Sequence, residues 1–247
     1  MPAAYTVNKI LQNDRVTETV YKMKVDLGGA PQPAPGQFYM VRGWEGNDPL
    51  LSRPISVSDA GEGTVTFLYE VRGRGTRLLS QLPAGGQVSL LGPAGTGFPV
   101  GEVSGRVAVV TGGIGLAPMI YTAKSLQNCQ VDFFCGFRDQ SYELEGLQGA
   151  VQRVAVATDS GREGQKGFVT DLFSVADYDW VLTCGPQVMM EKLGRACLDA
   201  GIRCLLSLER HMACGVGACL GCTCKTAHGA KCVCKEGPVF RAEEVIL

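Results

Sequence analysis

The sequence predicts an antiparallel β-barrel, then an α/β domain with a doubly wound parallel sheet, and finally a cysteine-rich loop segment. Three observations lead to this prediction. Residues 1–100 contain short β-branched or aromatic runs between glycine- and proline-rich turns. Residues 101–209 alternate continuous apolar runs with helical patterns. Over residues 210–247 cysteines and glycines replace the apolar runs, so we treat this stretch as a third segment.

Six strand-like runs in the first part of the chain predict the barrel. Turn-forming stretches such as residues 28–36 and 92–97 separate these runs. Six short strands at this spacing are typical of a small closed barrel, and one helix is expected over residues 76–81. The runs cover residues 5–11, 16–27, 36–42, 53–59, 63–71 and 87–93.

Continuous apolar runs predict the parallel sheet of the second part. The run at residues 106–113 ends in glycines, and residues 116–127 after it have helical spacing, as do residues 187–201. Strands buried on both faces and alternating with helices indicate a parallel sheet with helices on both sides. Further buried strands are expected at residues 130–137, 153–158, 179–186 and 203–209.

Charge and hydropathy exclude several classes of partner. The chain has 23 basic and 24 acidic residues, for a net charge of -1, which gives no electrostatic footprint for nucleic acid or an anionic membrane. No apolar run reaches the roughly 18 residues that a membrane span needs. The first residues also lack the basic start and apolar stretch of a signal peptide. We therefore expect a cytoplasmic protein without nucleic-acid or membrane partners.

Two glycine turns indicate a nucleotide site. TGGIG at residues 111–115 lies between an apolar strand and a helix, where glycines let the backbone approach a pyrophosphate and the helix offers free N–H groups. Its spacing differs from the ordinary dinucleotide fingerprint, so this turn alone is equally consistent with a tight structural connection. TCGP at residues 183–186 also follows a buried strand. Because ligands bind beyond the carboxyl ends of parallel strands, the two turns together favour a nucleotide site.

Two stretches of the barrel suit a phosphate-bearing ligand. RPIS at residues 53–56 combines an arginine, a constrained turn and a serine hydroxyl, although without context it is a strand with one arginine. FLYEVRGRGT at residues 67–76 adds Tyr69, whose ring could lie against a flat ligand. Gly75 and Thr76 in the same stretch open a helix whose N–H groups could bind a pyrophosphate.

Taken together, these motifs resemble a known family. PGQF, RPIS, GRGT, GGIGLAP and CGP occur in this order, as in the ferredoxin–NADP reductase superfamily. The resemblance implies a barrel that binds FAD through the arginine and serine of RPIS, and a second domain whose glycine turn binds a nicotinamide dinucleotide. No residue is placed to act as a base on an organic substrate, so no catalytic residue is predicted. The expected cofactor contacts are Arg53, Pro54, Ile55, Ser56, Leu68, Tyr69, Glu70, Gly75, Thr76, Gly112, Gly113, Gly115, Cys184, Gly185 and Pro186.

The cysteine-rich segment predicts a metal centre. In a reducing compartment a tight cysteine cluster favours metal binding or redox chemistry over disulfides. The spacing Cys214-x4-Cys219-x2-Cys222 is that of plant-type [2Fe–2S] ligands, whose fourth cysteine lies further along the chain. Structural zinc also takes four thiolates, but zinc ribbons usually have two separated C-x2-C pairs, whereas this segment has one. The candidates for the fourth ligand are Cys224, Cys232 and Cys234.

The same segment resembles that of the electron transfer subunits of type B dihydroorotate dehydrogenases, and the resemblance covers essentially the whole chain. In that family the fourth ligand precedes an acidic-Gly-Pro-Val-Phe sequence, which assigns Cys234 and leaves Cys224 and Cys232 without a role. The resemblance also implies a catalytic partner that carries FMN, in a heterotetramer with two copies of each subunit. Electrons from dihydroorotate would pass through FMN, [2Fe–2S] and FAD to NAD, in pyrimidine biosynthesis.

Two other functions are kept as alternatives. One is a diaphorase-like subunit of a hydrogenase or of a ferredoxin–NADP oxidoreductase complex, which would share the barrel, the glycine turn and a similar cysteine spacing. The other is an interaction module that zinc stabilises and that binds no flavin. The colour of the purified protein separates the zinc module from the rest, because a flavin and an iron–sulfur cluster both absorb visible light.

Overall fold

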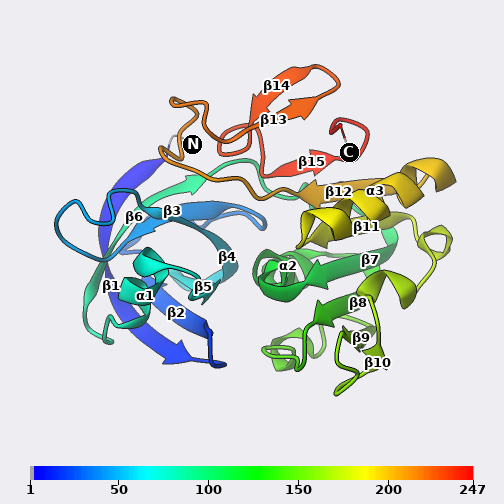
Figure 1. Cartoon of the computed structure of the whole chain (residues 1–247), viewed down its shortest axis with the longest axis horizontal. Coiled ribbons are helices and arrows are strands. Elements are labelled where there is room, and N and C mark those ends of the chain that lie inside the picture. The colour runs from blue at the N-terminus through cyan, green and yellow to red at the C-terminus, as the bar shows by residue number, and fades with distance from the viewer. Residues whose placement is uncertain (1–2, 247) are drawn as a thin grey trace.

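In the computed structural model, which describes residues 3–246, a closed barrel lies beside a seven-stranded sheet, and a short hairpin lies above both (Figure 1). The predicted fold class is confirmed. The strands are β1 (Ala4–Arg15), β2 (Val20–Asp26), β3 (Phe38–Arg42), β4 (Arg53–Gly61), β5 (Thr64–Glu70), β6 (Gln87–Ala94), β7 (Gly105–Gly112), β8 (Cys129–Phe137), β9 (Arg153–Thr158), β10 (Gln165–Lys166), β11 (Trp180–Cys184), β12 (Arg203–Ser207), β13 (Thr223–Thr226), β14 (Gly229–Cys232) and β15 (Val239–Arg241). The helices are α1 (Arg74–Ser80), α2 (Leu116–Ser125) and α3 (Gln187–Ala200), with 3₁₀ turns η1 (Gly113–Gly115), η2 (Glu145–Leu147), η3 (Val169–Asp171) and η4 (Val175–Asp177).

Six antiparallel strands close the barrel in the order β1-β2-β5-β4-β3-β6. Alternate side chains point inward, so Val25, Val57, Phe67 and Leu90 are at most 1% exposed and pack in one apolar cluster. Burying a side chain of this size stabilises the fold by about 1.5–3 kcal/mol, which makes this interior the main source of the barrel's stability. The register of β4 against β5 shifts between Val57 and Asp59, which marks a β-bulge.

The second sheet has the order β10-β9-β8-β7-β11-β12-β15. Its strands pair in parallel except for β15, which pairs antiparallel with β12 at the edge. Helix α2 packs on one face through residues such as Leu116, and α3 packs on the other through residues such as Leu193. The chain moves from β7 toward β8 and β9 in one direction and from β11 toward β12 in the other. The switch point of this doubly wound sheet therefore lies between β7 and β11.

The cysteine-rich segment is tied to both other parts of the chain. Strand β15 extends the parallel sheet, with Phe240 opposite Leu206 in β12. On the barrel side the Thr96 N–H donates to the carbonyl of Gly237. A single apolar cluster also joins Met40 of the barrel, Leu206 and Phe240. Residues 210–246 thus share a core with their neighbours, and Figure 1 shows their orange and red trace lying across both domains.

Helix α1 begins two residues earlier than expected. The Thr76 hydroxyl accepts hydrogen bonds from the N–H groups of Gly73 and Arg72, at 3.2 and 3.1 Å. Threonine therefore caps the helix from its third position, and Gly73 is the N-cap residue. Helix α3 follows the expected pattern, because it begins after Pro186 and ends at Gly201, whose φ of 68° is in the left-handed region.

Between residues 3 and 246, no helix is long and apolar enough to cross a bilayer. The longest helix, α3, has 14 residues. It is also amphipathic, since Met190 and Leu193 are buried against the sheet while Lys192 and Asp199 are exposed.

Candidate cofactor-binding site

The two predicted nucleotide turns lie side by side at the switch point of the sheet. They follow β7 and β11, adjacent parallel strands in which Thr111 is opposite Cys184. A Cβ atom on Gly115 would collide with the Cys184 carbonyl, and one on Gly185 would lie 2.8 Å from the nitrogen of Gly112. Glycine at these positions therefore lets the two turns pack backbone against backbone.

Gly113 has a different environment from the glycines on either side of it. Its φ is 55°, and a Cβ built on it would have no described atom within 4 Å other than those of residues 112–114. It begins the turn η1, which leads directly into α2. An open space over a glycine at the N-terminal end of a helix fits a pyrophosphate, since the backbone N–H groups and the helix dipole favour an anion there.

The two barrel motifs also meet in space. A Cβ on Gly75 would lie 2.5 Å from Nε and 2.7 Å from Cζ of Arg53, so the guanidinium of β4 rests directly on the first turn of α1. The same guanidinium lies over the ring of Trp44, 5.6 Å from its centroid. Held in this way, Arg53 is a fixed positive charge beside a helix N-terminus, an arrangement that suits the phosphates of a dinucleotide.

Side chains along β4 alternate between the barrel core and the outside. Ile55 is 9% exposed and packs in the barrel interior, whereas Pro54 and Ser56 are half-buried on the other side of the strand. Arg53 is also half-buried. Of the RPIS motif, the arginine, proline and serine are therefore accessible to a ligand, and the isoleucine stabilises the strand that presents them.

Tyr69 does not present an open ring. Its side chain is 3% exposed, its ring stacks on that of Tyr21 at 6.0 Å, and its hydroxyl donates to Oδ1 of Asn13 at 3.0 Å. Burial raises the pKa of Tyr69, so the phenol stays neutral. Alternation along β5 turns the Tyr69 ring into the barrel interior, where it is not accessible to a flat ligand. The Thr76 hydroxyl is used to cap α1, so the backbone of Thr76, and not its hydroxyl, is available to a ligand.

The end of β5 lies close to the CGP turn. Leu68 is buried in the apolar cluster that contains Leu116 of α2. Burial, and then the Glu209 carboxylate, raise the pKa of Cys184 to about 12, so this thiol is neutral at ordinary pH. The end of β5 and the two glycine turns therefore share one apolar cluster, in which Leu68 lies with Leu116 and Cys184.

Four cysteines of the C-terminal segment form two pairs. The Cys219 N–H donates to Sγ of Cys214 at 3.5 Å, and the two thiols are hydrogen-bonded. The Cys234 N–H donates to Sγ of Cys222 at 3.4 Å, and these thiols are also hydrogen-bonded. Gly217 donates to Sγ of Cys234 at 3.1 Å, which connects the second pair to the loop of the first.

The backbone around the first pair favours a thiolate. Burial acts to raise the pKa of Cys214, but hydrogen bonds from the backbone N–H groups of Val216, Cys219 and Ala218, and from the Cys219 thiol, outweigh it and lower the pKa to about 6. A loop that directs N–H groups at sulfur suits an anionic cluster. Cys234 differs, because burial and contact with Cys222 raise its pKa to about 12 in the absence of a metal.

Arrangement in pairs fits a two-iron cluster better than a single zinc ion. A zinc site would need four thiolates around one centre. A [2Fe–2S] cluster instead has two iron atoms, each of which takes two protein ligands.

Cys224 and Cys232 lie on the hairpin rather than in either pair. Cys224 in β13 is opposite Lys231 in β14, and Cys232 is opposite Thr223. Both thiols are buried, at 5% and 7% exposure, in the apolar cluster that joins the segment to the sheet. Their surroundings are those of small core residues, which accounts for two cysteines that the spacing alone left unexplained.

The loop of the first pair is anchored to the barrel next to the RPIS motif. Gly215 has a φ of 71°, and a Cβ on it would collide with the Met40 side chain of β3. Met40 is opposite Pro54 in the β3–β4 register. Cys214 therefore lies one strand away from the barrel motif. This contact could not be predicted from the sequence, because Met40 belongs to no motif and lies far from Gly215 along the chain.

Comparison with known proteins agrees with this geometry. The sequence profile of the "Iron-sulfur cluster binding domain of dihydroorotate dehydrogenase B" matches residues 209–246. A "Dihydroorotate dehydrogenase B (NAD(+)), electron transfer subunit" from Clostridium acetobutylicum is 46% identical over 247 residues, which covers 100% of this chain and 99% of the relative. One from Caldanaerobacter subterraneus is 40% identical over 96% of this chain and 97% of the relative. The chain belongs to the family of dihydroorotate dehydrogenase B electron transfer subunits.

Solved structures of other proteins have a similar fold. An NADH-dependent reduced ferredoxin–NADP oxidoreductase structure superposes with a TM-score of 0.83 at 27% identity, covering 98% of this chain and 90% of that one. A ferredoxin NADP+ reductase from Neisseria gonorrhoeae, with bound FAD and NADP, has a TM-score of 0.63 at 18% identity, over 80% and 92% of the two chains. The family and the fold expected from the sequence are both confirmed.

A substitution at Gly75 tests whether Arg53 is held for a ligand. Gly75→Ala should weaken FAD binding about tenfold, because an added methyl group must push the guanidinium away, and overpacking of this kind costs on the order of 1–3 kcal/mol. Fluorescence titration of the flavin-depleted protein measures the affinity. Gly73→Ala is the matched control, since among residues 3–246 no atom beyond residues 72–74 lies within 4 Å of its added Cβ. Equal affinity in both variants would contradict the assignment.

A second substitution tests the open space over Gly113. Gly113→Ala should raise the KM for NADH about tenfold, because the methyl group would occupy space that we assign to the pyrophosphate. Gly149→Ala is the control: its φ is 78° and its Cβ also meets nothing described within 4 Å. Both variants should lose about 1 kcal/mol of stability from the left-handed backbone. If the two had the same KM in NADH-dependent dye reduction, the turn would not be the nucleotide site.

Proposed function

We propose that this chain carries electrons between a dihydroorotate-oxidising partner and NAD, through a [2Fe–2S] cluster and FAD. The partner is a catalytic subunit that bears FMN, and the assembly contains two copies of each subunit. FAD supplies the exchange between one-electron and two-electron transfer, because nicotinamide exchanges hydride while a cluster carries single electrons. The chain's own residues bind the groups and hold them in order.

One observation carries this proposal: three sets of predicted residues converge on one region of the molecule. The RPIS strand meets the start of α1 at Gly75, and the cluster loop meets the adjacent strand at Met40. The CGP turn and the end of β5 share an apolar cluster through Cys184 and Leu68. From these contacts we infer that the FAD site of the barrel has the cysteine pairs on one side and the glycine turns on the other.

Each site has the donors that its group requires. Arg53, Ser56 and the first turn of α1 would hold FAD; the turns at residues 112–115 and 184–186 would hold NAD. Cys214, Cys219, Cys222 and Cys234 would hold the cluster. Support for Cys234 as the fourth ligand comes from its contact with Cys222 and from the Gly217 N–H at its sulfur.

An exposed apolar surface marks where the partner would dock. Val216 and Leu220 are 46% and 61% exposed, although both lie in the cluster loop, and Cys219 between them is also exposed. Leu220 has a φ of 57°, a strained conformation for leucine that the loop imposes. A partner that covers this surface would place its own redox group next to the first cysteine pair.

Reconstitution with the partner tests the function. The chain, co-expressed with its catalytic subunit, should couple oxidation of dihydroorotate to reduction of NAD, and the catalytic subunit alone should not reduce NAD. A complex that transfers electrons only between ferredoxin and the nicotinamide would instead support the second candidate, which the TM-score of 0.83 with the NADH-dependent reduced ferredoxin–NADP oxidoreductase favours.

Cysteine-to-serine variants test the ligand set. Cys234→Ser should lose the visible absorbance and the iron of the cluster while keeping FAD. Cys224→Ser and Cys232→Ser are the controls, because both thiols lie in the apolar core of the hairpin and should cost stability without loss of iron. Iron analysis and absorbance of the purified variants measure the outcome. A Cys234→Ser protein with a normal cluster spectrum would refute the assignment.

A further inference from the structure

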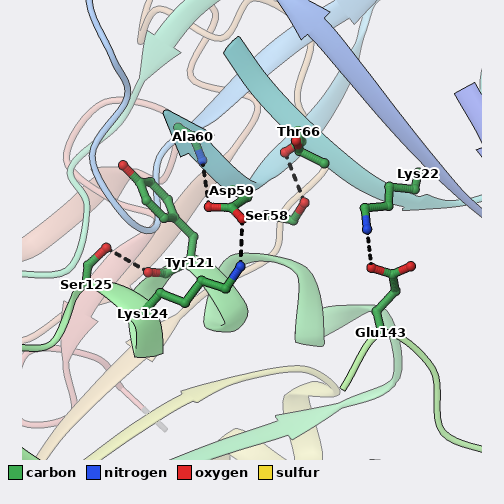
Figure 2. A network of polar contacts seen from close by, with 9 residues as sticks. All are labelled: Lys22, Ser58, Asp59, Ala60, Thr66, Tyr121, Lys124, Ser125 and Glu143. Carbon is green, nitrogen blue, oxygen red and sulfur yellow. Dashed lines mark hydrogen bonds and ion pairs between the residues drawn. The ribbon is translucent and has the colours of Figure 1, made fainter. Parts of the chain in front are cut away.

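Polar contacts join the barrel to the nucleotide side of the molecule at β2, β4 and α2 (Figure 2). Nζ of Lys124 in α2 lies 2.7 Å from Oδ2 of Asp59 in β4, and Nζ of Lys22 in β2 lies 2.6 Å from Oε2 of Glu143, in the loop after β8. We call these four residues the interdomain clasp. The Tyr121 hydroxyl adds a third link by donating to the carbonyl of Pro33 at 3.0 Å.

The clasp joins the far ends of the two elements that begin at the cofactor motifs. Strand β4 starts at Arg53 and reaches Asp59 near its other end. Helix α2 starts directly after the glycine turn and reaches Lys124 in its last turn. The two elements also pack against each other. A strand and a helix fixed at the clasp therefore hold their starting ends, and with them the flavin and nucleotide motifs, at a set separation.

A β-bulge turns Asp59 toward the helix. The register of β4 against β5 shifts between Val57 and Asp59, so Ser58 is the extra residue. Its hydroxyl donates to the carbonyl of Thr66 at 3.0 Å, which holds the bulge in place. Because of the shift, Val57 and Ala60 pack with the barrel interior while the Asp59 side chain points at α2. Bulges commonly redirect a side chain in this way.

The Asp59 carboxylate is also oriented by a hydrogen bond within its own strand. The second oxygen, Oδ1, accepts the Ala60 N–H at 3.0 Å, which leaves Oδ2 for Lys124. Side chains of the clasp are 25–43% exposed, so the pairs are partly shielded from solvent but remain sensitive to charge and salt. Ion pairs of this type are too weak to hold the fold by themselves, yet they can select one relative position of two elements that already pack together.

We propose that Asp59 and Lys124, assisted by Lys22 and Glu143, are positioning residues that set the approach of the nicotinamide to the flavin. This inference rests on the proposed function, because it assumes that β4 presents FAD and that the turn before α2 presents NAD. The rate of hydride transfer between nicotinamide and flavin depends steeply on the separation of the two rings. A small shift of α2 along β4 would therefore change this rate.

Charge-neutral and charge-reversed variants of the intact chain test the clasp. Asp59→Asn and Lys124→Met should each slow the reduction of bound FAD by NADH about fivefold in stopped-flow measurements, the order of effect that one half-exposed ion pair allows. They should also diminish the long-wavelength absorbance that a nicotinamide ring stacked on a flavin produces. The reversed double variant, Asp59→Lys with Lys124→Asp, should restore both the rate and the absorbance band.

Asp171→Asn is the matched control. Asp171 pairs with Lys192 at 3.1 Å, both partners are about half exposed, and both lie on the nucleotide side of the molecule. This variant should leave rate and band unchanged. If Asp59→Asn and Lys124→Met also retained them, or if the reversed variant stayed as slow as the single variants, the inference would be overturned. Absence of FAD reduction by NADH in the unaltered chain would instead overturn the proposed function.

Discussion

The structure depends on four glycines at which the backbone packs directly against a neighbouring element. Gly215 brings the cluster loop against Met40 of β3, and Gly75 lets Arg53 rest on the first turn of α1. Gly115 and Gly185 bring two strand ends into contact at the switch point of the sheet. A side chain at any of these positions would separate two elements that present cofactor motifs. Electron transfer needs its groups near one another, so the glycines matter more for the distances they allow than for the turns they make.

The cysteine-rich segment is part of the electron path and part of the fold. Strand β15 completes the edge of the parallel sheet, while Cys224, Cys232 and Val233 are buried in the cluster that also contains Met40. Because the same segment supplies the cysteine pairs, the position of the cluster is fixed by packing against both neighbours. This explains why a loop rich in glycine and cysteine, which could not fold by itself, holds a defined geometry here.

Much of this architecture can be predicted from the sequence, because strands buried on one or both faces leave a clear pattern of apolar residues. The motif residues could be found as well, since Arg53 and the glycine turns have recognisable neighbours. Contacts between motifs could not be predicted: nothing in the sequence links Gly215 to Met40 or Asp59 to Lys124. The burial of the Tyr69 ring was also missed, because the direction of a side chain in β5 depends on a register that only the closed barrel defines.

Reduction of the chain by NADH, followed by absorbance and low-temperature EPR, tests the central claim most directly. Oxygen must be excluded, and the chain should carry its full complement of FAD and iron. If the cluster loop on β3 and the glycine turns beside β5 serve one flavin site, NADH should bleach the flavin and also produce the EPR signal of a reduced two-iron cluster. Bleaching of the flavin without any cluster signal, even after long equilibration with excess NADH, would contradict a continuous path through this chain.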